Sequence, residues 1–122
     1  MTKKQKDEVK RLADDIDADD EAEVRAGFAW AEAAARARGA ARDLLESVRL
    51  LWQMLTDPHY VMRWETKAWI IVGLAYFISP LDAIPDPIPG AGYLDDAVVI
   101  AWCLHQISEE VQKYRSHMAK TQ

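Results

Sequence analysis

Apolar residues follow helical spacing along most of this chain. Eight of them recur at alternating steps of four and three, which places their side chains on one face of a helix. They are Trp30, Ala34, Ala37, Ala41, Leu44, Val48, Leu51 and Leu55. The pattern continues past Gly39, and a glycine inside a helix costs only about 1 kcal/mol. The spacing therefore predicts one long, alanine-rich helix over residues 21–56, with an apolar seam along one side.

The composition of this seam changes along its length. Its first half is mainly alanine, which lets a partner helix approach closely, and its second half is leucine and valine, which fill space. The seam predicts packing against another helix of the same chain. A homodimer formed through the seams of two copies, over residues 30–55, is the alternative.

A second apolar stretch follows Thr56-Asp57-Pro58, which stops the long helix because proline disfavours helix in the residue before it. The next helix is expected to start at Pro58, with Asp57 as its cap, and to run through Trp64 to about Ile78. From residue 68 onward this helix is apolar on all sides. Such a helix is typical of a protein core or of a segment that contacts lipid.

A last helix is predicted to open at Asp95 and Asp96 and to keep its helical apolar period as far as Met118. The sequence has no strand-like alternation of any length. It predicts an all-α protein, a small helical bundle. The long helix would pack beside a helical hairpin region at residues 58–118, whose two helices are joined by a loop rich in proline, glycine and aspartate.

Residues 1–20 carry dense charge, with a basic start followed by an acidic run. A stretch with so little apolar face buries little surface, so we expect a flexible N-terminal segment ahead of a single domain at 21–122. Asp19 or Asp20 is expected to cap the long helix, because negative charge is favoured at a helix N-terminus.

Charge, cysteine content and the length of the apolar run limit the possible partners and the cellular compartment. The net charge of -5 and the pI of about 5.1 argue against nucleic-acid binding, which needs a basic face. Cys103 is the single cysteine and lies in an apolar run, as expected for a buried thiol in a reducing compartment. The longest apolar run, 68–78, would span about 16 Å as a helix, against about 30 Å for the hydrocarbon core of a bilayer. We therefore expect a cytoplasmic protein, either free or peripheral at the inner membrane face.

The connection at 79–96 concentrates unusual residues. It holds four of the five prolines, two of the five glycines and four aspartates. Ser79 and Asp82 fit a capping box around a short helical turn, and Asp95 and Asp96 fit the start of the last helix. Helix capping thus gives these residues a structural explanation.

The same aspartates also allow a metal site. A structureless connection of this length is uncommon in a compact domain unless it has a function. If the flanking helices pack antiparallel, Asp82 and Asp86 approach Asp95 and Asp96 at one end of the hairpin. Oxygen-rich clusters of this kind suit Mg²⁺ or Ca²⁺. The most specific form of this hypothesis is a metal site that catalyses hydrolysis.

Residues 76–104 resemble the signature of the YkvA family, small bacterial proteins and modules of unknown function. The resemblance extends over about residues 64–104. The matching positions are Tyr76, Ser79, Pro80, Asp82, Ile84, Pro85, Asp86, Gly92, Tyr93, Asp95 and Asp96. The resemblance implies a helical hairpin, for which membrane association has been suspected, and no established activity, cofactor or catalytic residue. We take Ser79, Asp82, Asp86, Tyr93, Asp95 and Asp96 as the candidate functional residues.

Three functions are compatible with the sequence. The first is a helical interaction or adaptor module for an unknown protein partner, which requires no chemistry. The second is a membrane-associated hairpin formed by residues 68–78 and 97–104. The third is the metal site on the aspartate-rich loop. The chain contains no recognisable catalytic motif, which argues against an enzyme.

Overall fold

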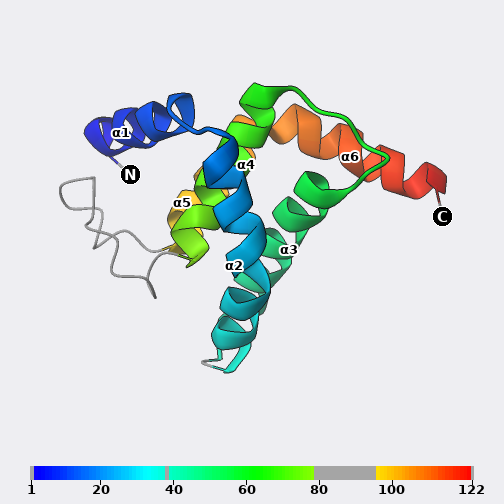
Figure 1. Cartoon of the computed structure of the whole chain (residues 1–122), viewed down its shortest axis with the longest axis horizontal. Helices are drawn as coiled ribbons and strands as arrows, with labels where there is room; N and C mark the ends of the chain where they lie inside the picture. The colour runs from blue at the N-terminus through cyan, green and yellow to red at the C-terminus, as the bar shows by residue number, and fades with distance from the viewer. Residues whose placement is uncertain (1, 38, 79–95, 122) are drawn as a thin grey trace.

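The computed structural model describes residues 2–37, 39–78 and 96–121 (Figure 1), the side chains of residues 96, 97 and 121 excepted. These residues form helices and turns, with no strand among them, which confirms the all-α helical bundle. The helices are α1 (Lys3–Asp14), α2 (Ala18–Ala37), α3 (Arg42–Thr56), α4 (Trp64–Ile78), α5 (Asp96–Gln106) and α6 (Ser108–Thr121).

Helix α4 lies at the centre of the bundle. Helices α1, α2, α3 and α5 all pack against it, so side chains on every side of α4 are covered. Ile70, Ile71 and Leu74 have no solvent exposure. At Gly73 a Cβ atom would lie 3.2 Å from Leu51 Cδ1 and 3.6 Å from Cys103 Cβ, so α3 and α5 approach α4 closely there. The apolar run at 68–78 is therefore a core helix, as one of the two interpretations predicted.

The long helix predicted over 21–56 is two helices, α2 and α3, which lie side by side and meet at a tight turn (Figure 1). Gly39 has a φ of +75°, a conformation in which glycine carries no Cβ penalty. The Gly39 N–H donates to the Arg36 carbonyl (3.1 Å) and the Ala40 N–H to the Ala35 carbonyl (3.0 Å). This is the Schellman closure of a helix C-terminus, so Gly39 ends α2 instead of continuing it.

The break divides the predicted seam. Val48, Leu51 and Leu55 of its second half are buried in the core, whereas Trp30 and Ala37 of its first half are exposed. Helix α2 instead buries Val24, Phe28 and Ala31. The Phe28 ring stacks on that of Trp52 at a centroid distance of 4.3 Å, which joins α2 to α3.

The N-terminal segment is helical and packed, which corrects the prediction of a flexible region over residues 1–20. Helix α1 opens with a capping box between Thr2 and Gln5. Val9 and Ala13 are buried in a cluster with Val72 of α4 and with α5. Their spacing of four gives α1 a narrow apolar stripe that the surrounding charges conceal in the sequence.

Two other helix starts differ from expectation. Helix α2 is capped by Asp17, because Asp17 Oδ1 accepts from the Asp20 N–H and Asp20 Oδ2 accepts from the Asp17 N–H, both at 3.0 Å. Helix α4 begins at Trp64 rather than at Pro58.

The predicted last helix is broken near Ile107 into α5 and α6. The Ile107 N–H is shared between the carbonyls of Cys103 (3.3 Å) and Leu104 (3.2 Å). Beyond this point α6 leaves the direction of α5 and extends to one side of the bundle (Figure 1). It therefore needs contacts of its own to stay attached.

Candidate functional site

The candidate residues of the loop fall mostly outside the described structure. Ser79, Asp82, Asp86, Tyr93 and Asp95 lie outside the described residues, and Asp96 is the first residue of α5. Among the residues that the structure describes, no group of three or more His, Cys, Asp or Glu is placed to hold a metal ion. The Mg²⁺ or Ca²⁺ site therefore stays a prediction.

A polar and aromatic cluster, which the sequence did not reveal, joins the 57–63 segment to α6. The Tyr60 hydroxyl donates to Glu110 Oε2 at 2.7 Å, and the Tyr114 hydroxyl donates to Asp57 Oδ2 at 3.1 Å. The Tyr60 and Tyr114 rings meet edge to face at a centroid distance of 5.0 Å. We call these four residues, with His117, the α6 clamp. Its partners lie 50 and 57 positions apart, so no local sequence pattern could show them.

The ionisation of the clamp follows from its hydrogen bonds. The backbone N–H of His59 donates to Asp57 Oδ1 at 2.9 Å and holds the pKa of Asp57 below its ordinary value, with smaller help from the Tyr114 hydroxyl. Burial raises the pKa of both Tyr60 and Tyr114 to about 12, and the carboxylates that they bond add to the effect. Both tyrosines are therefore neutral donors at neutral pH. This arrangement stabilises an attachment and is poorly suited to proton transfer.

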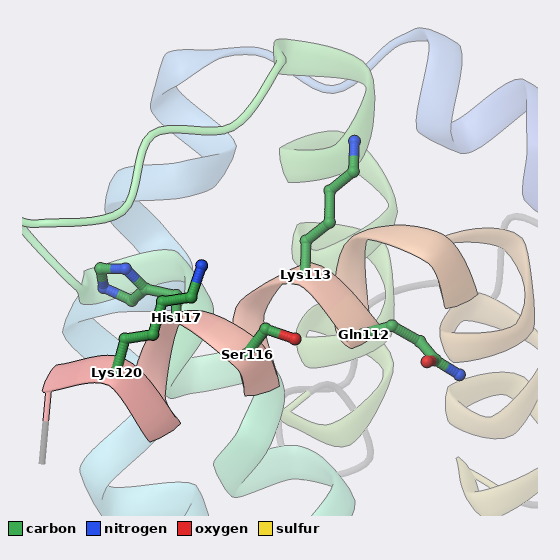
Figure 2. Close-up of a pocket in the computed structure, with 5 residues that line it drawn as sticks. All are labelled: Gln112, Lys113, Ser116, His117 and Lys120. Atoms are coloured by element: carbon green, nitrogen blue, oxygen red, sulfur yellow. The ribbon is translucent and has the colours of Figure 1, made fainter.

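His117 contacts other members of the clamp. Its Nε2 lies 3.7 Å from Asp57 Oδ2, and its ring contacts that of Tyr60. Ser116 is adjacent in sequence, but Figure 2 shows its hydroxyl directed away from the imidazole. The depression of about 420 Å³ drawn there is lined by α6 alone, through Gln112, Lys113, Ser116, His117 and Lys120. A surface formed by one helix encloses too little of a small molecule to position it for chemistry.

A second depression, of about 330 Å³, lies between α2 and α3 and contains three arginines. Each arginine has a carboxylate partner. Arg36 and Arg49 approach Glu32 at 3.7 and 3.2 Å, and Arg42 approaches Glu46 at 3.3 Å. These internal pairs leave little net positive charge for an anionic ligand.

Large apolar side chains reach solvent at the start of α4. Val61 is 91% exposed and Trp64 is 43% exposed, with the charged residue Arg63 between them. Met62 is buried, so the chain alternates inward and outward before the helix starts. We call residues 61–64 the 61–64 edge. No pattern in the sequence separates Val61 and Trp64 from the core, because Met62 between them does belong to it.

The comparisons with known proteins identify a family for this chain. The chain is 30% identical over 77 residues to the "Uncharacterized membrane protein YkvA" of Bacillus subtilis (strain 168), an alignment that covers 60% of this chain and 73% of the relative. The model of a family described as "Protein of unknown function (DUF1232)" matches residues 66–102. This small all-α protein belongs to that YkvA-like family. No solved structure matches the chain.

The family match confirms the resemblance in the sequence and locates it in the fold. Residues 66–102 include most of α4, the connection and the first part of α5, so the match covers the central helix and its partner. Helix α2 and Val61 lie outside it. Within the described parts of the chain, no helix is both long enough and apolar enough to cross a membrane.

Proposed function

We propose that this protein is a non-catalytic helical module that binds a membrane surface through the 61–64 edge. The observation that carries the proposal is the exposure of Val61 and Trp64 on either side of Arg63. Three residues of chain separate their Cα atoms by at most about 11 Å. Both side chains can therefore enter the same patch of a bilayer interface.

The chemistry of the edge suits that interface. An indole ring is favoured at the level of the lipid headgroups, and an aliphatic side chain favours the acyl boundary just below. An arginine between them can bond a lipid phosphate while its stem stays in apolar surroundings. Lys67, one helical turn after Arg63, adds positive charge, and Glu65 offsets part of it. Two apolar side chains give weak and reversible binding, which anionic lipid strengthens.

The membrane contact proposed here differs from the hairpin predicted from the sequence. Residues of both predicted hairpin segments are in the core: Ile71 and Leu74 of α4, and Val99, Ile100 and Cys103 of α5. Exposing them to lipid would dismantle the bundle. The 61–64 edge offers apolar surface without any change of fold. The name of the Bacillus relative, a membrane protein, supports contact with a membrane.

Vesicle flotation tests the proposal with matched variants. The double variant Val61→Ser/Trp64→Ser removes both apolar side chains of the edge. The control Val98→Ser/Trp30→Ser removes one exposed valine and one exposed tryptophan elsewhere, at 42% and 59%. With dilute protein and vesicles of phosphatidylcholine and phosphatidylglycerol, we expect the edge variant to lose at least about tenfold in partitioning and the control to bind like the wild type.

Equal binding by the wild type and the edge variant would overturn the proposal. Absence of wild-type binding to any vesicle would do the same, and it would favour the second candidate, an adaptor that recognises a protein partner. Vesicles of phosphatidylcholine alone separate the two contributions to binding. Apolar insertion persists on them, whereas attraction between Arg63 and anionic headgroups is lost.

A further inference from the structure

We propose that the outer face of α2 binds the same face of a second copy, so that the protein forms an antiparallel homodimer. This interface uses a different surface from the 61–64 edge and does not depend on membrane binding. The α2 outer face consists of exposed apolar residues at helical spacing. They are Ala22, Ala26, Ala29, Trp30, Ala33 and Ala37.

Helix α2 has apolar residues on two opposite sides, and only one of them is covered within the described part of the protein. The inner side, with Val24, Phe28 and Ala31, packs into the core. On the outer side, every exposed residue from Ala26 to Ala33 is apolar. A helix that faces water normally carries charged residues there, so this face has the composition of a second packing surface.

Trp30 is the residue that distinguishes this face from an ordinary run of alanines. It is 59% exposed, against 43% for Trp64. Tryptophan is enriched among the residues that carry most of the energy of protein interfaces. The alanines beside it allow a facing helix to approach to about 8 Å, close enough to cover the indole ring.

Symmetry and charge identify the partner as a second copy in antiparallel orientation. The midpoint of the face lies between Ala29 and Trp30, so a twofold axis there places Ala22 opposite Ala37 and Ala26 opposite Ala33 of the partner. The two copies of Ala29 and the two copies of Trp30 then lie next to this axis.

The ends of the helix are complementary in this orientation. The first turn of α2 carries Asp19, Asp20 and Glu21. Its last turn carries Arg36, whose side chain stays 59% exposed beside its own partner Glu32, 3.7 Å away. Antiparallel pairing brings the acidic end of one copy to the basic end of the other, and it also opposes the two helix dipoles. Parallel pairing would place like charges together.

The size of the face sets the strength of the dimer. Sixteen helical residues extend over about 24 Å, and a helix face is about 10 Å wide. The surface that such a face can bury is well below the roughly 800 Å² per partner of a standard stable interface. The dimer is therefore weak, and it dissociates on dilution.

Cysteine cross-linking tests the pairing directly. In the antiparallel dimer the two copies of Ala29 lie near the twofold axis, within the roughly 7 Å between Cα atoms that a disulfide requires. The two copies of Ala22 are about 22 Å apart along the axis, whereas parallel pairing would place them side by side. The native Cys103 is buried and its pKa is raised to about 12, so it does not compete. We expect Ala29→Cys to form a disulfide-linked dimer on mild oxidation and Ala22→Cys to remain monomeric.

Sedimentation velocity over a wide range of protein concentration gives the second readout. The wild type is expected to shift reversibly from monomer to dimer, and Trp30→Glu is expected to stay monomeric at every concentration with an unchanged circular dichroism spectrum. Cross-linking of Ala22→Cys but not of Ala29→Cys would overturn the antiparallel arrangement. A wild type that stays monomeric throughout, without an Ala29→Cys cross-link, would overturn the dimer. Neither result bears on vesicle binding, which is measured with dilute protein.

Discussion

Tyr60 and Tyr114 show how single residues hold α6 in place. Each hydroxyl donates to a carboxylate, and each pKa is raised to about 12 from an ordinary value of 10. Burial of the hydroxyls and, after it, their bonds to carboxylates make each pKa higher in the folded than in the unfolded protein, so the neutral tyrosines contribute their full stabilisation below pH 10. Their contribution is lost as the pH rises from about 10 through about 12.

We therefore expect the free energy of unfolding to fall across that interval, and we expect Tyr60→Phe/Tyr114→Phe to have a smaller alkaline loss. Urea unfolding at a series of pH values measures the effect, and ultraviolet difference absorbance follows tyrosine ionisation. An identical alkaline loss in the wild type and the double variant would contradict the role given to these hydroxyls.

Gly39 and Asp57 mark the limit of prediction at the scale of residues. Gly39 fits a helix at a cost of about 1 kcal/mol, and the apolar spacing continues on both sides of it, so the sequence favours one helix. The structure has two helices instead, because α2 and α3 both pack against α4. Contacts between residues so distant in the sequence leave no local pattern. Asp57 was expected to cap a helix, and it instead bonds the hydroxyl of Tyr114, which lies 57 residues away.

At the scale of elements, the sequence predicted α4 best. Its apolar run is long and uninterrupted, so the sequence predicted a helix that lies in the core or contacts lipid. The burial of Ile70, Ile71 and Leu74 assigns it to the core. The outer side of α2 was harder to interpret. Trp30, Ala34 and Ala37 appeared to continue the seam of Val48 and Leu51, because their spacing is the same. Only the break between α2 and α3 shows that Trp30 and Ala37 face outward, whereas Val48 and Leu51 face inward.

The core position of α4 predicts the effect of a charge within it. Ile71 has no solvent exposure, and an unpaired buried carboxylate costs several kcal/mol, a large part of the usual stability of a domain. We expect Ile71→Asp to unfold the protein in lipid-free buffer, as seen by loss of the helical circular dichroism signal.

Val98→Asp is the control for Ile71→Asp. Val98 lies on α5 and is 42% exposed, so its carboxylate stays hydrated and the fold should remain. A folded and stable Ile71→Asp variant would contradict the assignment of α4 to the core and would reopen the hairpin as a lipid-facing structure.

At the scale of the whole molecule, α1 belongs to the same folding unit as the helices that it covers. Val9 is fully buried, and it shares a cluster with Val72 of α4 and with Val99 and Cys103 of α5. These contacts connect the start of the chain to the two helices of the family region. This contact could not be predicted from the sequence, because the two buried residues of α1, Val9 and Ala13, lie among charged ones.

Val9→Ser therefore tests whether the N-terminal helix is part of one cooperative structure. The change leaves a cavity and a buried hydroxyl, which together cost about 2–3 kcal/mol. Lys10→Ser, at the neighbouring exposed position, should change the unfolding free energy by less than about 0.5 kcal/mol. Urea unfolding is followed by circular dichroism, which reports all helices, and by tryptophan fluorescence, which reports the five tryptophans. None of the five is in α1, and Trp69 and Trp102 lie against this cluster. If α1 is integral, both midpoints fall together in Val9→Ser. The opposite result is a loss of helical signal with an unchanged fluorescence midpoint. It would mean that α1 unfolds independently of the core.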